Sequence, residues 1–391
     1  FIMSELAGKY KQLIAFVRAH YSEQASVPLH APVFHGNEKR YLNDCIDSSF
    51  VSSVGEYVNR FEAMMCEITE AKYAVATMNG TAALHVSLLL AGVKANEEVL
   101  TQSLTFVATC NAIAYLGAAP VFVDVDEQTI GLSAVKLRCF LERYAEKAPE
   151  GCINSATRRR IAAILPMHTF GFPCDMEAII AISREWQIPV VEDCAESLGS
   201  YIGTQHTGNF GLVAAFSFNG NKITTCGGGG CIITNDDELG VLAKHLTTTA
   251  KQPHPWLFNH DTVGFNYRMP NINAALGCAQ LELLPAMLAD KRHTAQCYQV
   301  FCTQHDIHYC RAPAGTQSNY WLNTVLTSSV TERDALLEYA AQQQVMCRPV
   351  WTPMHLLPMY ATAQHDELEN TLQFAARIVN LPSSARIYSG N

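Results

Sequence analysis

From residue 70 onward, short apolar runs alternate with longer segments of helical periodicity. The apolar runs predict strands at residues 73–78, 99–102, 120–125, 161–167, 189–192, 214–218 and 231–234. Helices are expected over residues 80–90, over 105–116 and after Asp175. Nearly continuous apolar strands separated by helices of this length are typical of a mostly parallel sheet covered on both faces. The pattern therefore predicts an α/β fold.

The two ends of the chain carry weaker patterns. Their spacing predicts a helix over 4–22, a connector around Pro28 and Pro32, a helix over 37–48, a long helix from about 273, a strand over 322–326 and helices over 331–344 and 366–379. Residues 144–160 break the alternation and are expected to form a surface loop. We predict three parts: an N-terminal helix and connector (1–30), a large domain (31–275) and a smaller C-terminal α+β domain (276–391).

Composition excludes some classes of protein. The chain has 391 residues, of which 49% are hydrophobic and 16% charged, which is enough for a large core. The formal net charge of −9 does not favour binding to nucleic acid, and no apolar run approaches the ~20 residues of a membrane span. The 14 cysteines form no CxxC pair, which argues against a zinc ribbon and fits a reducing compartment. We expect a cytoplasmic protein without a metal site.

Lys222 and Asp193 carry the strongest chemical signal. Lys222 follows a predicted strand that ends in Phe216-Ser217-Phe218, and Asp193 closes the earlier apolar run Val190-Val191-Glu192. Pyridoxal phosphate chemistry requires a lysine that forms a Schiff base and an aspartate that keeps the pyridine nitrogen protonated. Taken alone, Lys222 reads as a solvated lysine in a glycine-rich loop. Its spacing from Asp193 and Ser217 favours the catalytic interpretation.

Other residues fit the same cofactor. Gly80 and Thr81 stand where a strand meets the N-terminus of a helix, a position that favours a phosphate, although an ordinary helix cap explains them equally well. Ser217 is placed to donate to that phosphate. Phe106 begins the next helix and can stack on a pyridine ring, or belong to the core. Glu196 follows Asp193 by one helical turn and is expected to reach the ring hydroxyl or the Schiff base.

At this point the residues resemble a known family, the DegT/StrS nucleotide-sugar aminotransferases. The resemblance covers nearly the whole chain and rests on an ordered series: Asn79-Gly80-Thr81-Ala82-Ala83-Leu84, Thr105-Phe106-Val107-Ala108-Thr109, residues 120–126, Val191-Glu192-Asp193, Phe216-Ser217-Phe218 with Lys222, and Gly264-Phe265-Asn266-Tyr267-Arg268-Met269. It implies the aspartate-aminotransferase (type I) fold and pyridoxal 5′-phosphate as cofactor.

The resemblance also implies roles for particular residues. Phosphate would be bound by Gly80, Thr81 and Ser217, and the ring would lie against Phe106, while Asp193 and Lys222 keep the roles given above. Asn266 is implied to reach the phosphate of a neighbouring subunit, which predicts a homodimer with shared active sites. Glu196 departs from the family pattern, in which Gln or His is frequent.

Four segments resemble one branch of the family, which makes 4-amino-4,6-dideoxy-N-acetyl sugars for bacillosamine or legionaminic acid. They are residues 36–39, 50–55, 219–222 and 247–251. The implied substrates are L-glutamate and a nucleotide-linked, UDP-type 4-keto-6-deoxy-2-acetamido sugar. Three alternatives remain: a 3-aminotransferase on another nucleotide keto sugar, a sugar 3-dehydratase, which lacks the lysine, and a catalytically silent regulatory or binding protein.

Candidates for substrate contact come from less specific signals. Lys251 and His254 follow the Thr-Thr-Thr stretch and are expected on the sugar-nucleotide side. Arg348 in the C-terminal part is a candidate for the carboxylate of the amino donor. His168 ends a predicted strand, and its position in the cleft or in the core is left open. The run Arg158-Arg159-Arg160 reads as a solvated face.

Overall fold

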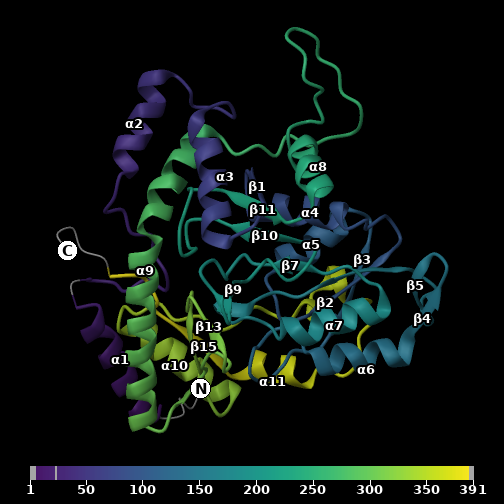
Figure 1. The fold of residues 1–391 in the computed structure, drawn as a ribbon. Helices are drawn as coiled ribbons and strands as arrows, with labels where there is room; N and C mark the ends of the chain where they lie inside the picture. The colour runs from purple at the N-terminus through teal and green to yellow at the C-terminus, as the bar shows by residue number, and fades with distance from the viewer. Residues whose placement is uncertain (1–5, 23, 387–391) are drawn as a thin grey trace.

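A twisted sheet runs through the larger part of the chain in the computed structural model, which describes residues 6–22 and 24–386 (Figure 1). In spatial order its strands are β1 (Tyr73–Thr77), β11 (Gly230–Thr234), β10 (Val213–Ser217), β7 (Val191–Asp193), β6 (Ile161–Leu165), β2 (Glu98–Gln102) and β3 (Ala119–Val123). The bridges Ile164–Val190 and Met167–Asp193 join β6 to β7. Because only β11 runs antiparallel to its neighbours, the predicted mostly parallel sheet is confirmed.

Both faces of the sheet are covered, and this explains why the strands are apolar throughout. Successive residues of a strand point to opposite faces. On β10, Ala214 and Phe216 pack into one cluster with α3 (Glu56–Thr69) and the first half of α9 (Asn271–Gln304). Val213 and Ala215 pack into a second cluster, on the opposite face. That face is covered by α4 (Gly80–Leu90), α5 (Val107–Tyr115) and α8 (Asp237–Thr247), while α6 (Ala134–Tyr144) and α7 (Met176–Trp186) pack on β2, β3 and β6.

The remaining elements form a smaller layer at the other end of α9. They are α1 (Gly8–His20), β12 (His308–Tyr309), β14 (Asn323–Leu326), α10 (Val330–Gln342), α11 (Glu369–Arg377) and β15 (Ile378–Leu381). The N-terminal helix α1 shares its core with Tyr298, Val325 and Leu336, so it packs with the C-terminal part of the chain. Its predicted first residues, 4 and 5, lie outside the described residues. The proposed domain boundary at residue 275 falls inside α9, which links the two parts.

The described chain also contains several short elements. They are α2 (Glu38–Ser48), β8 (Tyr201–Ile202), β9 (Gln205–His206) and β13 (Thr316–Gln317), together with single 3-10 turns at Thr169–Gly171, Met354–Leu356 and Pro358–Tyr360. Helix α5 begins two residues later than expected because Phe106 has an extended backbone, with φ −68° and ψ 145°.

The prediction of a surface loop over 144–160 is wrong. The segment contains an antiparallel hairpin of β4 (Ala145–Ala148) and β5 (Gly151–Asn154). Gly151, at φ +122°, completes the turn, and the side chain of Asn154 is buried, where its amide donates to Glu98 at 2.8 Å. The strands are too short for a clear alternation of apolar and polar residues, which is why the pattern missed them.

Helix α9 is the one helix of the described chain that is long and apolar enough to cross a membrane. Half of its most apolar window is buried inside the protein, against the sheet and α3. Its apolar composition is therefore accounted for by core packing.

Candidate active site

A cavity of about 230 Å³ opens where the carboxyl ends of β7 and β10 meet the N-terminus of α4. Parallel strands bring residues from distant parts of the sequence to one edge of the sheet, where ligands of α/β proteins bind. The lining includes the predicted residues Gly80, Thr81, Phe106, Asp193, Glu196, Ser217 and Lys222. It also includes Thr109, Met167, Asn219, Asn221, Trp321 and Trp351.

The turn into α4 is built to bind an anion. Asn79 caps the helix by accepting from the backbone N–H of Ala82 at 2.8 Å. The first amides of the helix, at Gly80 and Thr81, have no acceptor within the helix and point out of its N-terminus. A Cβ on Gly80 would lie 2.7 Å from Cβ of Ser217, so only glycine allows this approach. The turn and the serine hydroxyl thus form one cradle.

Asp193 lies buried at the floor of the cavity. Its carboxylate accepts from the hydroxyl of Thr109 at 2.8 Å and from the backbone N–H of Ala195 at 3.1 Å. Burial raises the pKa of Asp193, and these two hydrogen bonds and the charge of Lys222 oppose that effect. A buried carboxylate in this position is stabilised by a cationic partner inside the cavity.

Lys222 follows β10 on a short turn and lines the cavity. Its Nζ lies 3.9 Å from Oε1 of Glu196 and 4.2 Å from the centre of the Trp321 ring. Burial lowers the pKa of Lys222, while Glu196 and Asp193 oppose the shift. A lowered pKa favours the neutral amine, the form that a nucleophile or base needs.

A backbone N–H group holds the carboxyl of Glu196 in place. Its Oε2 accepts from the N–H of Phe170 at 2.7 Å, and Phe170 has a left-handed backbone with φ 58°. Burial raises the pKa of Glu196 to about 7, an effect that Lys222 and the N–H of Phe170 oppose. The carboxyl therefore lies beside the lysine nitrogen, as the spacing of Glu196 from Asp193 predicted. With this pKa it is readily protonated.

Phe106 presents an unusually exposed ring to the cavity. It is 51% exposed and stands at the N-cap of α5, so it is not a core residue.

Gly230 explains part of the run Gly227 to Gly230: a Cβ there would lie 2.2 Å from the carbonyl oxygen of Asn79. The glycines thus let β11 pass close beneath the turn that starts α4.

Four predicted residues are not brought into this cavity. Asn266 is exposed beside Thr248, and Lys251 and His254 lie on the loop between α8 and α9, which projects from the top of the molecule in Figure 1. The Lys251 ammonium lies over the ring of Phe258, at 4.2 Å. Arg348 lines a neighbouring cavity.

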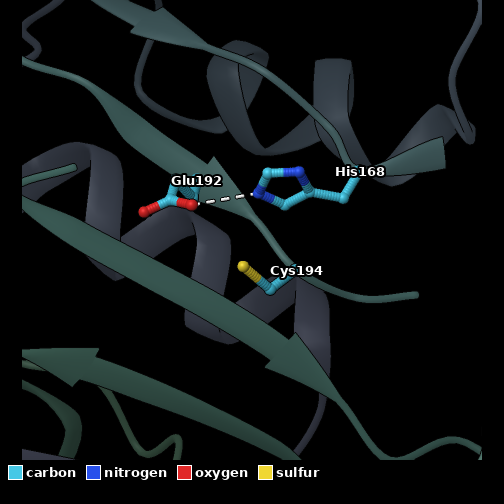
Figure 2. Close-up of side chains that lie close together, drawn as sticks. All are labelled: His168, Glu192 and Cys194. Carbon is cyan, nitrogen blue, oxygen red and sulfur yellow. Dashed lines mark hydrogen bonds and ion pairs between the residues drawn. The ribbon is translucent and has the colours of Figure 1, made fainter. Parts of the chain in front are cut away.

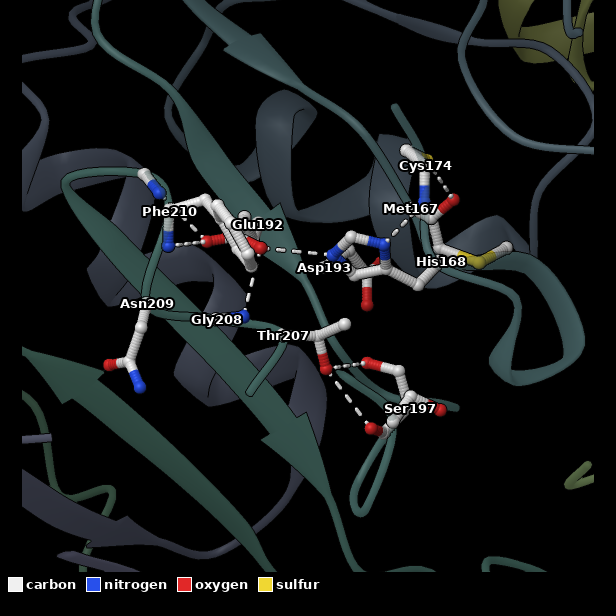
Figure 3. A network of polar contacts seen from close by, with 12 residues as sticks. Met167, His168, Cys174, Glu192, Asp193, Ser197, Thr207, Gly208, Asn209 and Phe210 are labelled. Carbon is white, nitrogen blue, oxygen red and sulfur yellow. Dashed lines mark hydrogen bonds and ion pairs between the residues drawn. The ribbon is translucent and has the colours of Figure 1, made fainter. Parts of the chain in front are cut away.

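His168 lies in the core and not in the cleft, with 0% exposure. Its Nδ1 accepts from the backbone N–H of Cys174 at 3.0 Å, so the neutral ring carries its proton on Nε2, which lies 3.0 Å from Oε1 of Glu192 (Figure 2). The remaining positions of the Glu192 carboxylate are taken by the backbone N–H groups of Gly208, Phe210 and Gly211 (Figure 3).

His168, Glu192 and Cys194 place three potential metal ligands within 4.8 Å of one another. Because both carboxylate oxygens and both ring nitrogens already have protein partners, we assign no metal to this cluster. Its role is to fix β7. Glu192 points to one face of that strand, and Asp193, the next residue, points to the cavity.

These features fit pyridoxal phosphate. The cavity offers an anion cradle with no room for a Cβ at Gly80, a half-exposed aromatic ring at Phe106, a buried carboxylate in need of a cation at Asp193, and an amine at Lys222. Sequence reasoning missed Thr109 and Trp321. Thr109 lies inside the Thr105–Thr109 segment, where the sequence could have indicated it, whereas Trp321 comes from a distant part of the chain.

Comparisons with known proteins agree with this site. Residues 33–390 match the DegT/DnrJ/EryC1/StrS aminotransferase family. GDP-perosamine synthase from Escherichia coli O157:H7 is 36% identical over 91% of this chain and 93% of its own length. The enzyme of the same name from Vibrio cholerae is 34% identical over 91% of this chain and 94% of its own. The structure of the aminotransferase TlmJ from Streptoalloteichus hindustanus has a TM-score of 0.82 at 27% identity, covering 92% of this chain and 94% of TlmJ.

Fold and site together define a pyridoxal-phosphate-dependent transferase of the type I fold. The chain belongs to the DegT/DnrJ/EryC1/StrS aminotransferase family, so it is an aminotransferase and its cofactor is pyridoxal phosphate. The names of its relatives do not confirm the bacillosamine or legionaminic-acid branch that the four segments suggested.

Proposed function

We propose that the enzyme transfers the amino group of L-glutamate to C4 of a UDP-linked 4-keto-6-deoxy-2-acetamido sugar, a building block of surface glycans. The proposal concerns the sugar, the nucleotide and the donor, since the class of enzyme and the cofactor follow from the family. We further propose that it acts in the cytoplasm as a homodimer.

The observation that carries the proposal is the position of the segments that resemble the UDP-sugar branch. Arg268 donates to the carbonyl of Thr248 at 3.3 Å and to Oγ1 of Thr249 at 3.1 Å, and its NH1 lies 3.5 Å from Oγ of Ser53. Its own backbone bridges to Thr77, at the end of β1 and just before the Gly80 turn. Two segments distant in sequence, 50–55 and 247–251, are thus neighbours beside the phosphate cradle.

Six of the cavity residues have a task in this reaction. Bound pyridoxal phosphate supplies an electron sink for the carbon that loses its proton. The amine of Lys222 moves that proton, from the α-carbon of glutamate in one half-reaction and to C4 of the sugar in the other. Asp193 keeps the pyridine nitrogen protonated. The amides of Gly80 and Thr81 and the hydroxyl of Ser217 hold the phosphate, and Phe106 covers the ring.

A second candidate is transfer to a GDP-linked keto sugar. The two GDP-perosamine synthases, whose name specifies a GDP-linked amino sugar, favour it. Both candidates use the same cavity chemistry and differ in the nucleotide.

A panel assay distinguishes the candidates. The enzyme is incubated with glutamate and UDP-, GDP- or dTDP-linked 4-keto-6-deoxy sugars, and the products are read by mass spectrometry, with Lys222→Ala as the blank. The proposal expects an amino sugar from the UDP-linked 2-acetamido substrate. An amino sugar from the GDP-linked substrate alone would replace it with the second candidate, and no amino sugar from any of the 4-keto substrates would contradict the assigned position.

A further inference from the structure

A second cavity, of about 410 Å³, adjoins the one that contains Lys222. The two share the lining residues Asn221, Trp321 and Trp351. Most of the remaining lining is apolar, from Pro28, Leu29, Leu322, Met346, Pro349 and Val350. Its polar side chains are few, so each one restricts the kind of ligand that the cavity can bind.

Trp321 forms the wall between the two cavities. One face of its ring lies 4.2 Å from Nζ of Lys222, and its ring centre lies 6.4 Å from that of His30 in the second cavity. Its Nε1 donates to the carbonyl of Asn221 at 2.7 Å, which ties the ring to the turn that carries Lys222. The second cavity therefore adjoins the position of Lys222, with Trp321 between them.

A buried lysine fixes the protonation of His30. Nζ of Lys291 donates to the carbonyls of Trp321 and Ser383 and contacts Nε2 of His30 at 2.9 Å. Burial lowers the pKa of Lys291 to about 7. In the ammonium form each of its three N–H groups meets one acceptor, so Nε2 of His30 accepts and its proton is on Nδ1.

The Nδ1–H of His30 is then a donor without an acceptor. The atom is buried and has no hydrogen-bond partner among the described residues. Leaving a buried donor without an acceptor is destabilising, so such a group indicates a missing acceptor. Arg348 adds an exposed guanidinium to the same cavity. The two groups offer N–H donors and a positive charge in an otherwise apolar space.

We propose that the second cavity is a subsite for an oxyanion of a substrate whose reacting carbon lies beside Lys222, with the Nδ1–H of His30 and the guanidinium of Arg348 as its donors. The inference rests on the proposed function and adds His30 as a recognition residue. The oxyanion is either the distal carboxylate of the amino donor or the diphosphate of the sugar nucleotide. Both are acceptors for a guanidinium and an N–H group.

Two substitutions of His30 separate recognition from support of Lys291. In His30→Gln the amide reaches the position of Nε2 and still accepts from Lys291, but nothing replaces the Nδ1–H. In His30→Asn the shorter amide offers an N–H near the position of Nδ1 and loses the contact with Lys291. Arg348→Gln removes the charge, and Arg311→Gln, at an exposed arginine of a separate cavity, is the control.

Binding is measured by calorimetry with two unreactive probes, glutarate for the donor and UDP for the nucleotide, alongside KM for glutamate and for the keto sugar. His30→Gln and Arg348→Gln are expected to weaken one probe and raise the matching KM about tenfold, the effect of one lost hydrogen bond to a charged group. His30→Asn and Arg311→Gln should stay near wild type. Weakening of glutarate alone assigns the subsite to the donor, and weakening of UDP alone assigns it to the nucleotide.

Two results would overturn the subsite. One is unchanged binding of both probes in His30→Gln and Arg348→Gln. The other is weakening in His30→Asn with none in His30→Gln, which would mean that His30 only supports Lys291. If the sugar panel fails while probe binding depends on His30 and Arg348, the proposed function falls and the subsite stands. If His30→Gln and Arg348→Gln turn over the panel normally with unchanged KM, the subsite falls and the proposed function stands.

Discussion

Nζ of Lys222 and Oε1 of Glu196 lie 3.9 Å apart in the cavity. Burial disfavours the charged form of each, so the pKa of the amine is lowered and that of the carboxyl is raised to about 7. Two groups that burial shifts toward their neutral forms are thus placed side by side. Such an arrangement suits proton transfer and is costly as a purely structural ion pair.

The first prediction concerns Asp193. Asp193→Asn should bind the cofactor but lose activity by a factor on the order of 10² or more, because a neutral side chain no longer stabilises the protonated pyridine nitrogen. Thr109→Val removes only one donor to that carboxylate and should cost much less. Turnover rates of the two variants are compared under saturating substrates. Near-full activity of Asp193→Asn would remove Asp193 from the site.

The pKa of Glu196 predicts how stability depends on pH. The folded pKa of about 7 lies above the ordinary 4.5, so between these values the native state binds more protons than the unfolded state. The free energy of unfolding contributed by this group therefore falls as pH rises through that window, by about 3 kcal/mol at most. Glu196→Gln does not titrate and should gain stability over wild type, more at pH 8 than at pH 5.

Urea unfolding of the cofactor-free proteins at the two pH values checks this sign. Glu67→Gln, at an exposed position of α3, is the control and should show no such trend. A stability difference between Glu196→Gln and wild type that is the same at pH 5 and pH 8 would show that burial does not shift the carboxyl.

Gly80 should tolerate no side chain. In Gly80→Ala the new Cβ would lie 2.7 Å from Cβ of Ser217, and one of the two must move out of the cradle. Cofactor affinity, measured by titrating the cofactor-free protein, is expected to fall at least tenfold, as for a lost charge-assisted hydrogen bond. Gly220→Ala is the matched control, since nothing lies within 4 Å of its Cβ position. Equal affinities for the two variants would contradict the cradle.

Asn266 tests whether active sites are shared between subunits. Because it is exposed and outside the cavity of its own chain, Asn266→Ala should be inactive only if it acts on a neighbouring subunit. Mixing Lys222→Ala with Asn266→Ala should then restore part of the activity, since some hybrid sites receive both intact residues. Subunit exchange is verified separately with tagged chains. An active Asn266→Ala variant, or exchange without recovery, would place Asn266 outside a shared site.

The sequence predicted the sheet and the core of the site for one physical reason. Lys222, Asp193 and Gly80 each follow a strong apolar strand, and the carboxyl ends of parallel strands meet at one edge. The hairpin at Gly151 was missed because its strands are short. His30 and Trp321 were missed because they reach the cavities through contacts between distant parts of the chain, and no local spacing marks them. The position of His168 could not be predicted because a histidine at the end of a strand can lie either in the cleft or in the core.

The most direct test of the account is the fate of the donor nitrogen. The enzyme is given glutamate labelled with ¹⁵N and the keto sugar that it accepts, and the sugar product is examined by mass spectrometry and NMR. The account predicts ¹⁵N at C4 of the sugar, in amounts equal to the 2-oxoglutarate formed, and no label with Lys222→Ala. A sugar product that carries no ¹⁵N, or labelled product formed by Lys222→Ala at the wild-type rate, would contradict it.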